Sequence, residues 1–183
     1  MRVASSDNHP PVLILTNEIQ YHSVYMNSKE TKLIRDQLCH AMRGDQSHLE
    51  FAAAIKDFPP ESRGHKPANA PHTAWQLLEH LRIAQWDILE FSKDSKHKSP
   101  KWPEGYWPTT EAPPSSDAWD ISVKAFESDL RQMEDLVQDE SQDLFKTIEH
   151  GDGQTLLQEA LTLADHNSYH LGQLVYLKKI LLG

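Results

Sequence analysis

Four stretches of this chain repeat apolar residues with the 3.6-residue period of an α-helix, and this pattern limits its fold more than any other feature. They cover residues 29–57, 73–92, 117–138 and 155–182. In each stretch the apolar residues form one stripe, which is typical of helices that pack together around a shared core. The pattern predicts an all-α fold, a four-helix bundle, with Gly44 as the point at which the first helix is most prone to kink or split.

The connection between the second and third predicted helices is unusually long and contains five of the eleven prolines. We expect it to form a long crossover in the bundle. It also carries Trp102, Tyr106 and Trp107, whose rings would be costly to leave in water, so we expect it to fold back as a lid over a pocket. The alternative is a rigid surface loop whose aromatic side chains plug an edge of the core away from any site.

Residues 1–28 show no sustained helical period and are predicted to form an irregular N-terminal arm packed on the bundle, with residues 29–183 as a single domain. A chain of 183 residues that is 38% hydrophobic can build one core of ordinary size. Its 27 acidic and 18 basic residues give a net charge of −9, which disfavours nucleic acids and anionic membranes as partners. The longest apolar run near the start, residues 12–15, is too short for a secretion signal or a membrane span, so we expect a cytoplasmic protein.

Two histidines, His166 and His170, lie four residues apart on the last predicted helix, so their side chains share one face. His166 follows Leu163 by three residues and His170 precedes Leu174 by four, which places both on the stripe that faces the interior. Two neighbouring buried imidazoles each need partners for their ring nitrogens, and one divalent cation satisfies both as neutral ligands. The pair therefore predicts a metal site.

His80 is the best candidate for a third ligand, because it lies on the apolar side of the second predicted helix. Three neutral histidines leave a tetrahedral ion one open position, as in catalytic sites, and the lone Cys39 excludes a Cys-rich structural zinc site. His48 falls on the inner stripe of the first predicted helix and is either a hydrogen-bonded core residue or part of the pocket lining. His72 is expected in a loop near the mouth at most. The remaining histidines are predicted to be solvated: His9, His22, His40, His65, His97 and His150.

The segment 155–183, with HNSYH at residues 166–170, resembles the last helix of the DinB/YfiT-like family of metal-dependent enzymes, and residues 72–81 resemble its second helix. The resemblance covers residues 29–183. It implies a four-helix bundle with a long crossover and a divalent metal, commonly nickel or zinc, bound by one histidine on the second helix and two on the last. By position these ligands are His80, His166 and His170.

The resemblance is compatible with several activities, and the family it points to includes thiol transferases. We expect a metal-dependent transferase of the thiol S-transferase type, whose small-molecule substrates include a low-molecular-weight thiol. A metal-dependent hydrolase is the alternative enzyme. Such an enzyme is helped by a carboxylate base near the metal, but Asn167, Ser168 and Tyr169 stand between the two histidines. A non-catalytic stress-response module that binds a small ligand is the third candidate. Zinc, nickel, copper and ferrous iron all suit three imidazoles, and a homodimer is expected if Trp102 and Trp107 do not pack within the chain.

Overall fold

The computed structural model describes residues 27–183, and this part of the chain folds into helices without a β-strand. This confirms the all-α prediction. The predicted N-terminal arm lies outside the described residues, apart from Asn27 and Ser28, which begin the first helix. The α-helices are α1 (Ser28–Arg43), α2 (Phe51–Ile55), α3 (Ala74–Lys93), α4 (Ala118–Gln138) and α5 (Leu156–Leu182), joined by the short 3-10 helices η1 (Pro60–Ser62) and η2 (Glu104–Tyr106).

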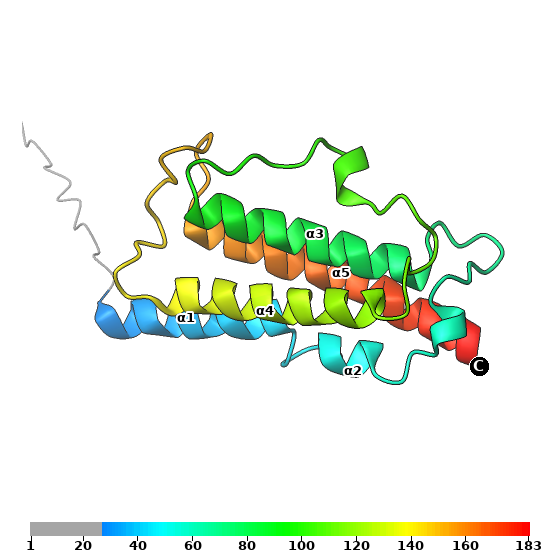
Figure 1. Ribbon diagram of the computed structural model, residues 1–183. Helices are drawn as coiled ribbons and strands as arrows, with labels where there is room; N and C mark the ends of the chain where they lie inside the picture. Colours follow the sequence, from blue (N-terminus) through cyan, green and yellow to red (C-terminus); the bar gives the residue numbers. More distant parts are fainter. Residues whose placement is uncertain (1–26) are drawn as a thin grey trace, which may run out of the picture.

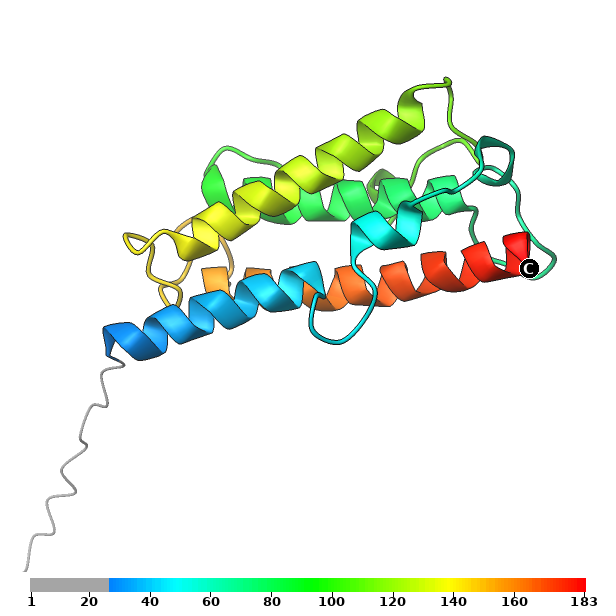
Figure 2. The same ribbon diagram turned by 90° about the horizontal axis from the view of Figure 1, so that it is seen from below.

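The four long helices lie side by side as a bundle, in which α3 and α1 each pack against both α4 and α5 (Figures 1 and 2). Residues 94–117 leave the far end of α3 and return along the length of the bundle to the start of α4, so α3 and α4 run in the same direction (Figure 1). Helix α5 runs opposite to α3. This arrangement brings the middle of α3 against the middle of α5.

The first predicted helix, residues 29–57, is in fact two helices, and it splits at Gly44, the position at which a break was predicted. Helix α1 ends at Gly44, which adopts the left-handed conformation at φ +72° and donates its N–H to the carbonyls of His40 and Ala41. A glycine in this conformation is a common helix stop, because it carries no Cβ to clash. The chain then forms a short loop that contains His48 before α2 begins.

Helix starts follow the predicted capping signals. The Thr73 hydroxyl accepts a hydrogen bond from the Gln76 N–H while the Gln76 side chain accepts one from the Thr73 N–H, so the predicted capping box forms. The same Thr73 hydroxyl donates to the carbonyl of Glu111 at 2.7 Å, which ties the crossover segment to the start of α3. At α5 the Thr155 hydroxyl accepts from the Gln158 N–H.

The core divides into two apolar clusters, one at each end of the bundle. One contains Leu78, Leu81 and Leu174, and the other contains Leu89, Met133 and Leu163. Between them lie two buried polar side chains, Gln85 of α3 and Asn167 of α5, which are joined by a hydrogen bond of 2.8 Å. The predicted metal ligands lie beside this pair: His80 is buried, whereas His166 and His170 are partly buried. The candidate site therefore belongs to a polar layer in the middle of an apolar bundle.

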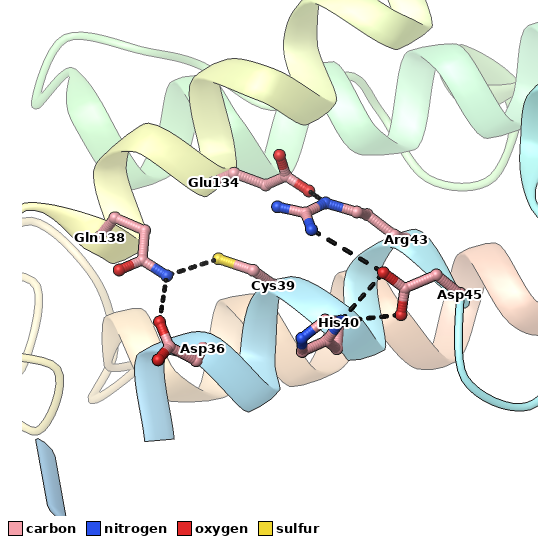
Figure 3. A network of polar contacts seen from close by, with 7 residues as sticks. All are labelled: Asp36, Cys39, His40, Arg43, Asp45, Glu134 and Gln138. Carbon is pink, nitrogen blue, oxygen red and sulfur yellow. Dashed lines mark hydrogen bonds and ion pairs between the residues drawn. The ribbon is translucent and has the colours of Figure 1, made fainter. Parts of the chain in front are cut away.

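Polar contacts also join α1 to α4 near the surface (Figure 3). The Arg43 guanidinium donates to Glu134 at 2.5 Å, and the Gln138 amide donates to Asp36 at 3.1 Å and to the Cys39 sulfur at 3.3 Å. Burial raises the pKa of the Cys39 thiol, so it stays protonated and acts as a small packing residue.

Within residues 27–183, none of the helices combines the length and the apolar character needed to span a bilayer.

Candidate metal centre

Three histidine side chains from two antiparallel helices meet in the polar layer. His80 comes from α3, and His166 and His170 come from successive turns of α5. The Nε2 atom of His80 lies 3.1 Å from Nε2 of His166 and 3.1 Å from Nε2 of His170. One ring nitrogen from each of the three residues falls within 4.8 Å of the others, an arrangement that is compatible with a bound metal ion.

Hydrogen bonds at the far side of two rings fix which nitrogen faces the centre. Nδ1 of His80 lies 2.9 Å from the carbonyl oxygen of Tyr106, which can only accept, so Nδ1 carries the proton. Nδ1 of His170 lies 3.2 Å from Oε1 of Gln173 and donates in the same way. A neutral imidazole has one N–H, so both Nε2 atoms point unprotonated lone pairs at the centre.

The environment keeps these rings neutral. Burial, with the neighbouring histidines as a smaller cause, lowers the pKa of His170 to about 4. Burial also lowers the pKa of His80 to about 4, against a hydrogen bond to Tyr106 that favours the charged form, and it lowers the pKa of His166. At neutral pH the three side chains are therefore uncharged imidazoles, which can donate an electron pair to a metal, rather than imidazolium ions.

A divalent cation fits this donor set. The Nε2 lone pairs of His80 and His170, held 3.1 Å apart, repel one another, and a shared cation turns that repulsion into attraction. The spacing is close to the edge of about 3.3 Å expected between two nitrogens around a tetrahedral ion with bonds of about 2.0–2.1 Å. The buried Nδ1 of His166 has no hydrogen-bond partner among the described residues.

The crossover segment covers the histidines from one side. The Trp107 ring stacks on His80 with centroids 3.9 Å apart and an interplanar angle of 3°, and it also stacks on His72 at 3.9 Å. Tyr106 supplies the carbonyl that orients His80. Trp102 does not share this position, because it is 68% exposed and its ring contacts Tyr106. Of the three predicted lid aromatics, Trp107 packs its ring on the histidine cluster and Tyr106 contacts it through its backbone carbonyl, whereas Trp102 does neither.

Asp87 anchors this part of the crossover, and sequence reasoning missed it. Its carboxylate accepts a hydrogen bond from the Tyr106 hydroxyl at 2.5 Å and contacts Nε2 of His97 at 2.7 Å. Burial raises the pKa of Tyr106 to about 12, so its hydroxyl remains a donor. The prediction of a solvated His97 was wrong, because the side chain is only 8% exposed and is held by Asp87. The available signal was the position of Asp87, seven residues after His80 and hence on the same side of α3.

His48 does not lie on a helical stripe, and that prediction was wrong. It follows the break at Gly44 in a bend and is exposed. Its Nε2 atom lies 2.9 Å from the Ser168 hydroxyl, which places the ring beside α5 and not on the metal ligands.

Among residues 27–183 no aspartate, glutamate or cysteine joins the three histidines at ligand distance. The protein offers three neutral nitrogens, and a tetrahedral ion bound by them has a fourth position for water or substrate. Such a centre can polarise or deprotonate a molecule bound at that position.

Comparison with known proteins places this geometry in a family. A family model described as the DinB superfamily matches residues 44–174, which run from the end of α1 well into α5 and include all three histidines. Comparisons with curated proteins and with solved structures gave no match. Because the family model covers well over half of the chain, the protein belongs to the DinB superfamily.

Proposed function

We propose that this protein is a metal-dependent transferase of the thiol S-transferase type, with one divalent ion, zinc or nickel, held by His80, His166 and His170. The observation that carries the proposal is the convergence of three neutral imidazoles, two of them with their Nε2 lone pairs fixed toward the centre by Tyr106 and Gln173. Such an ion supplies Lewis acidity that lowers the pKa of a bound thiol, so that the thiolate is available at neutral pH.

The surrounding side chains orient the ligands and exclude water. The Tyr106 carbonyl and the Gln173 amide hold two of the three rings in one tautomer. Trp107 covers the His80 ring and removes solvent from that side. In the reaction a bond forms between the thiol sulfur and an electrophilic carbon, the leaving group departs with its electron pair, and the thiol proton passes to solvent.

No carboxylate among residues 27–183 joins the three histidines at ligand distance, which favours a thiol over water as the nucleophile. A metal-bound water is helped by a general base, whereas a thiolate needs none once its proton has been lost. The closest buried carboxylates along α3 are already engaged, Glu79 by Arg82 and Ser122, and Asp87 by Tyr106 and His97.

The test begins with protein purified without a metal-affinity step. Elemental analysis should find about one zinc or nickel per chain, and the His166→Ala variant should lose it while the exposed His150→Ala variant retains it. The metal-loaded protein is then given glutathione, cysteine or another cellular thiol together with 1-chloro-2,4-dinitrobenzene, and release of chloride is measured. We expect conjugation that depends on both the metal and His166.

Two outcomes contradict the transferase. Hydrolysis of an ester substrate by the metal-loaded protein without any thiol conjugation would identify a hydrolase. A tightly bound metal without turnover of either substrate would identify a binding module.

A further inference from the structure

A cavity of about 340 Å3 lies next to the metal centre. Its walls are the loop 67–72, Leu77 from α3, and Gln173, Tyr176, Leu177 and Ile180 from α5. This volume is at the lower end of the range that holds small-molecule ligands, about 300–1,000 Å3.

The cavity is one helical turn from the metal ligands. Leu77 precedes His80 by three residues on α3, and Gln173 follows His170 by three residues on α5. At 1.5 Å of rise per residue, this corresponds to about 4.5 Å along each helix. The cavity therefore begins about one helical turn from the three histidines, toward the start of α3 and the end of α5.

Two residues of the cavity wall link it to the metal ligands: one contacts a ligand directly, and the other contacts the side chain that covers a ligand. The Gln173 amide oxygen accepts the Nδ1 proton of His170 at 3.2 Å. The His72 ring stacks on Trp107, and Trp107 stacks on His80. A ligand in the cavity thus touches Gln173, which orients His170, and His72, which packs on the ring that covers His80.

The chemistry of the lining selects an uncharged ligand. None of the side chains that form the walls carries a formal charge at neutral pH, because burial, and secondarily Lys66, lowers the pKa of His72. Most of the lining is apolar, with Leu77, Leu177 and Ile180 facing a loop that contains Pro67 and Pro71. The two prolines restrict that loop and favour a cavity that exists before the ligand arrives.

We propose that this cavity binds an uncharged, apolar small molecule. Its role rests on the proposed transferase. In that enzyme the bound molecule is the apolar body of the electrophile, and its reactive carbon faces the metal centre. Binding itself requires no metal.

The probe for this site is N-phenyl-1-naphthylamine, a neutral apolar fluorophore, added to the metal-free and the metal-loaded full chain. We expect one bound probe per chain in both forms. Ala68→Phe fills the cavity from its exposed loop, and Ile180→Asp places a charge on its rim, so each should weaken binding at least tenfold. Ala53→Phe, on the exposed face of α2 and outside the cavity, is the matched control and should bind like the parent. Circular dichroism checks that each variant folds.

The proposal is overturned if the probe does not bind, or if both cavity variants bind it as the parent does. These outcomes are separate from failure of the transferase. Probe binding that responds to Ala68→Phe, in a protein that conjugates no thiol, keeps the apolar site and removes only the catalytic proposal. Thiol conjugation that saturating probe does not inhibit keeps the transferase and contradicts the role of the cavity as its electrophile site.

Discussion

Asp87 contacts the residue that orients one of the candidate metal ligands. It holds the Tyr106 hydroxyl, and the carbonyl of the same residue accepts the Nδ1 proton of His80. Asp87→Asn removes the charge from this contact and should lower the affinity for zinc about tenfold, since partners of metal-bound histidines typically contribute 10–100-fold. Competition with a chromogenic chelator measures the change. Asp117→Asn, at an exposed helix start, is the control.

A double-mutant cycle tests whether the effect travels through Tyr106. If Asp87 acts on His80 by way of the tyrosine, the combined Asp87→Asn and Tyr106→Phe variant should bind zinc no more weakly than the worse single variant. Additive losses would show that the two residues act independently and would remove the proposed positioning role.

The lowered pKa values of the cluster predict how the metal-free protein responds to acid. In the folded state His80 and His170 have pKa values of about 4, whereas the unfolded chain takes up these protons near the usual value of 6.5. The unfolded state therefore binds more protons below pH 6.5, and the free energy of unfolding should fall as the pH decreases from 6.5 toward 4. Urea titrations at pH 7, 6 and 5 measure this slope. His170→Gln should make the slope shallower, and an unchanged slope would contradict the depressed pKa of His170.

At the scale of the elements, Gly44 decides where the first helix ends. Its φ of +72° disfavours any other residue, and a Cβ at this position would lie 2.0 Å from Cε1 of His48. Gly44→Ala should lower the free energy of unfolding by at least about 1 kcal/mol, measured by urea denaturation. Gly172→Ala is the matched control, because its Cβ would meet no atom within 4 Å in the helix interior, and it should raise stability by about 0.5–1 kcal/mol. Equal effects of the two substitutions would contradict this account of Gly44.

The helices could be predicted from sequence because their signals are local. The apolar period placed the second, third and fourth predicted helices within about a residue of α3, α4 and α5, and Thr73 with Gln76 marked a real start. The same apolar period continues past Gly44, so it marked this glycine as a point of a possible split without deciding that the helix ends there. His48 was misplaced for that reason.

The three histidines could be found for the same reason, since each continues a stripe into the interior. The contacts made by the crossover segment could not be predicted in this way. Asp87 meets Tyr106 and His97 only because the crossover returns along α3, and no periodic pattern records the path of an irregular segment. The aromatic residues gave a reason for the loop to fold back, but not the end of the bundle that it covers.

At the scale of the whole molecule, a polar layer separates two apolar clusters and reduces the stability of the metal-free bundle. A metal that binds only the folded protein should restore this stability. At a free concentration of one hundred times its Kd, zinc contributes about 2.7 kcal/mol, which corresponds to an increase in Tm of about 5–10 °C for a chain of this size. Thermal melts with zinc and with excess chelator measure the shift, and His166→Ala should show none. An equal shift in that variant would place the bound metal elsewhere.

The contact between Trp107 and His80 also has an optical consequence. The indole ring of Trp107 lies 3.9 Å from the imidazole ring of His80, so its fluorescence intensity depends on the electronic state of that neighbour. Binding of nickel or copper, whose partly filled d shells quench nearby excited states, should dim Trp107, whereas zinc, with a filled shell, should leave it bright. The difference in emission between the parent protein and a Trp107→Phe variant isolates this signal from the other four tryptophans. The emission of Trp107 would therefore report which ion the three histidines bind.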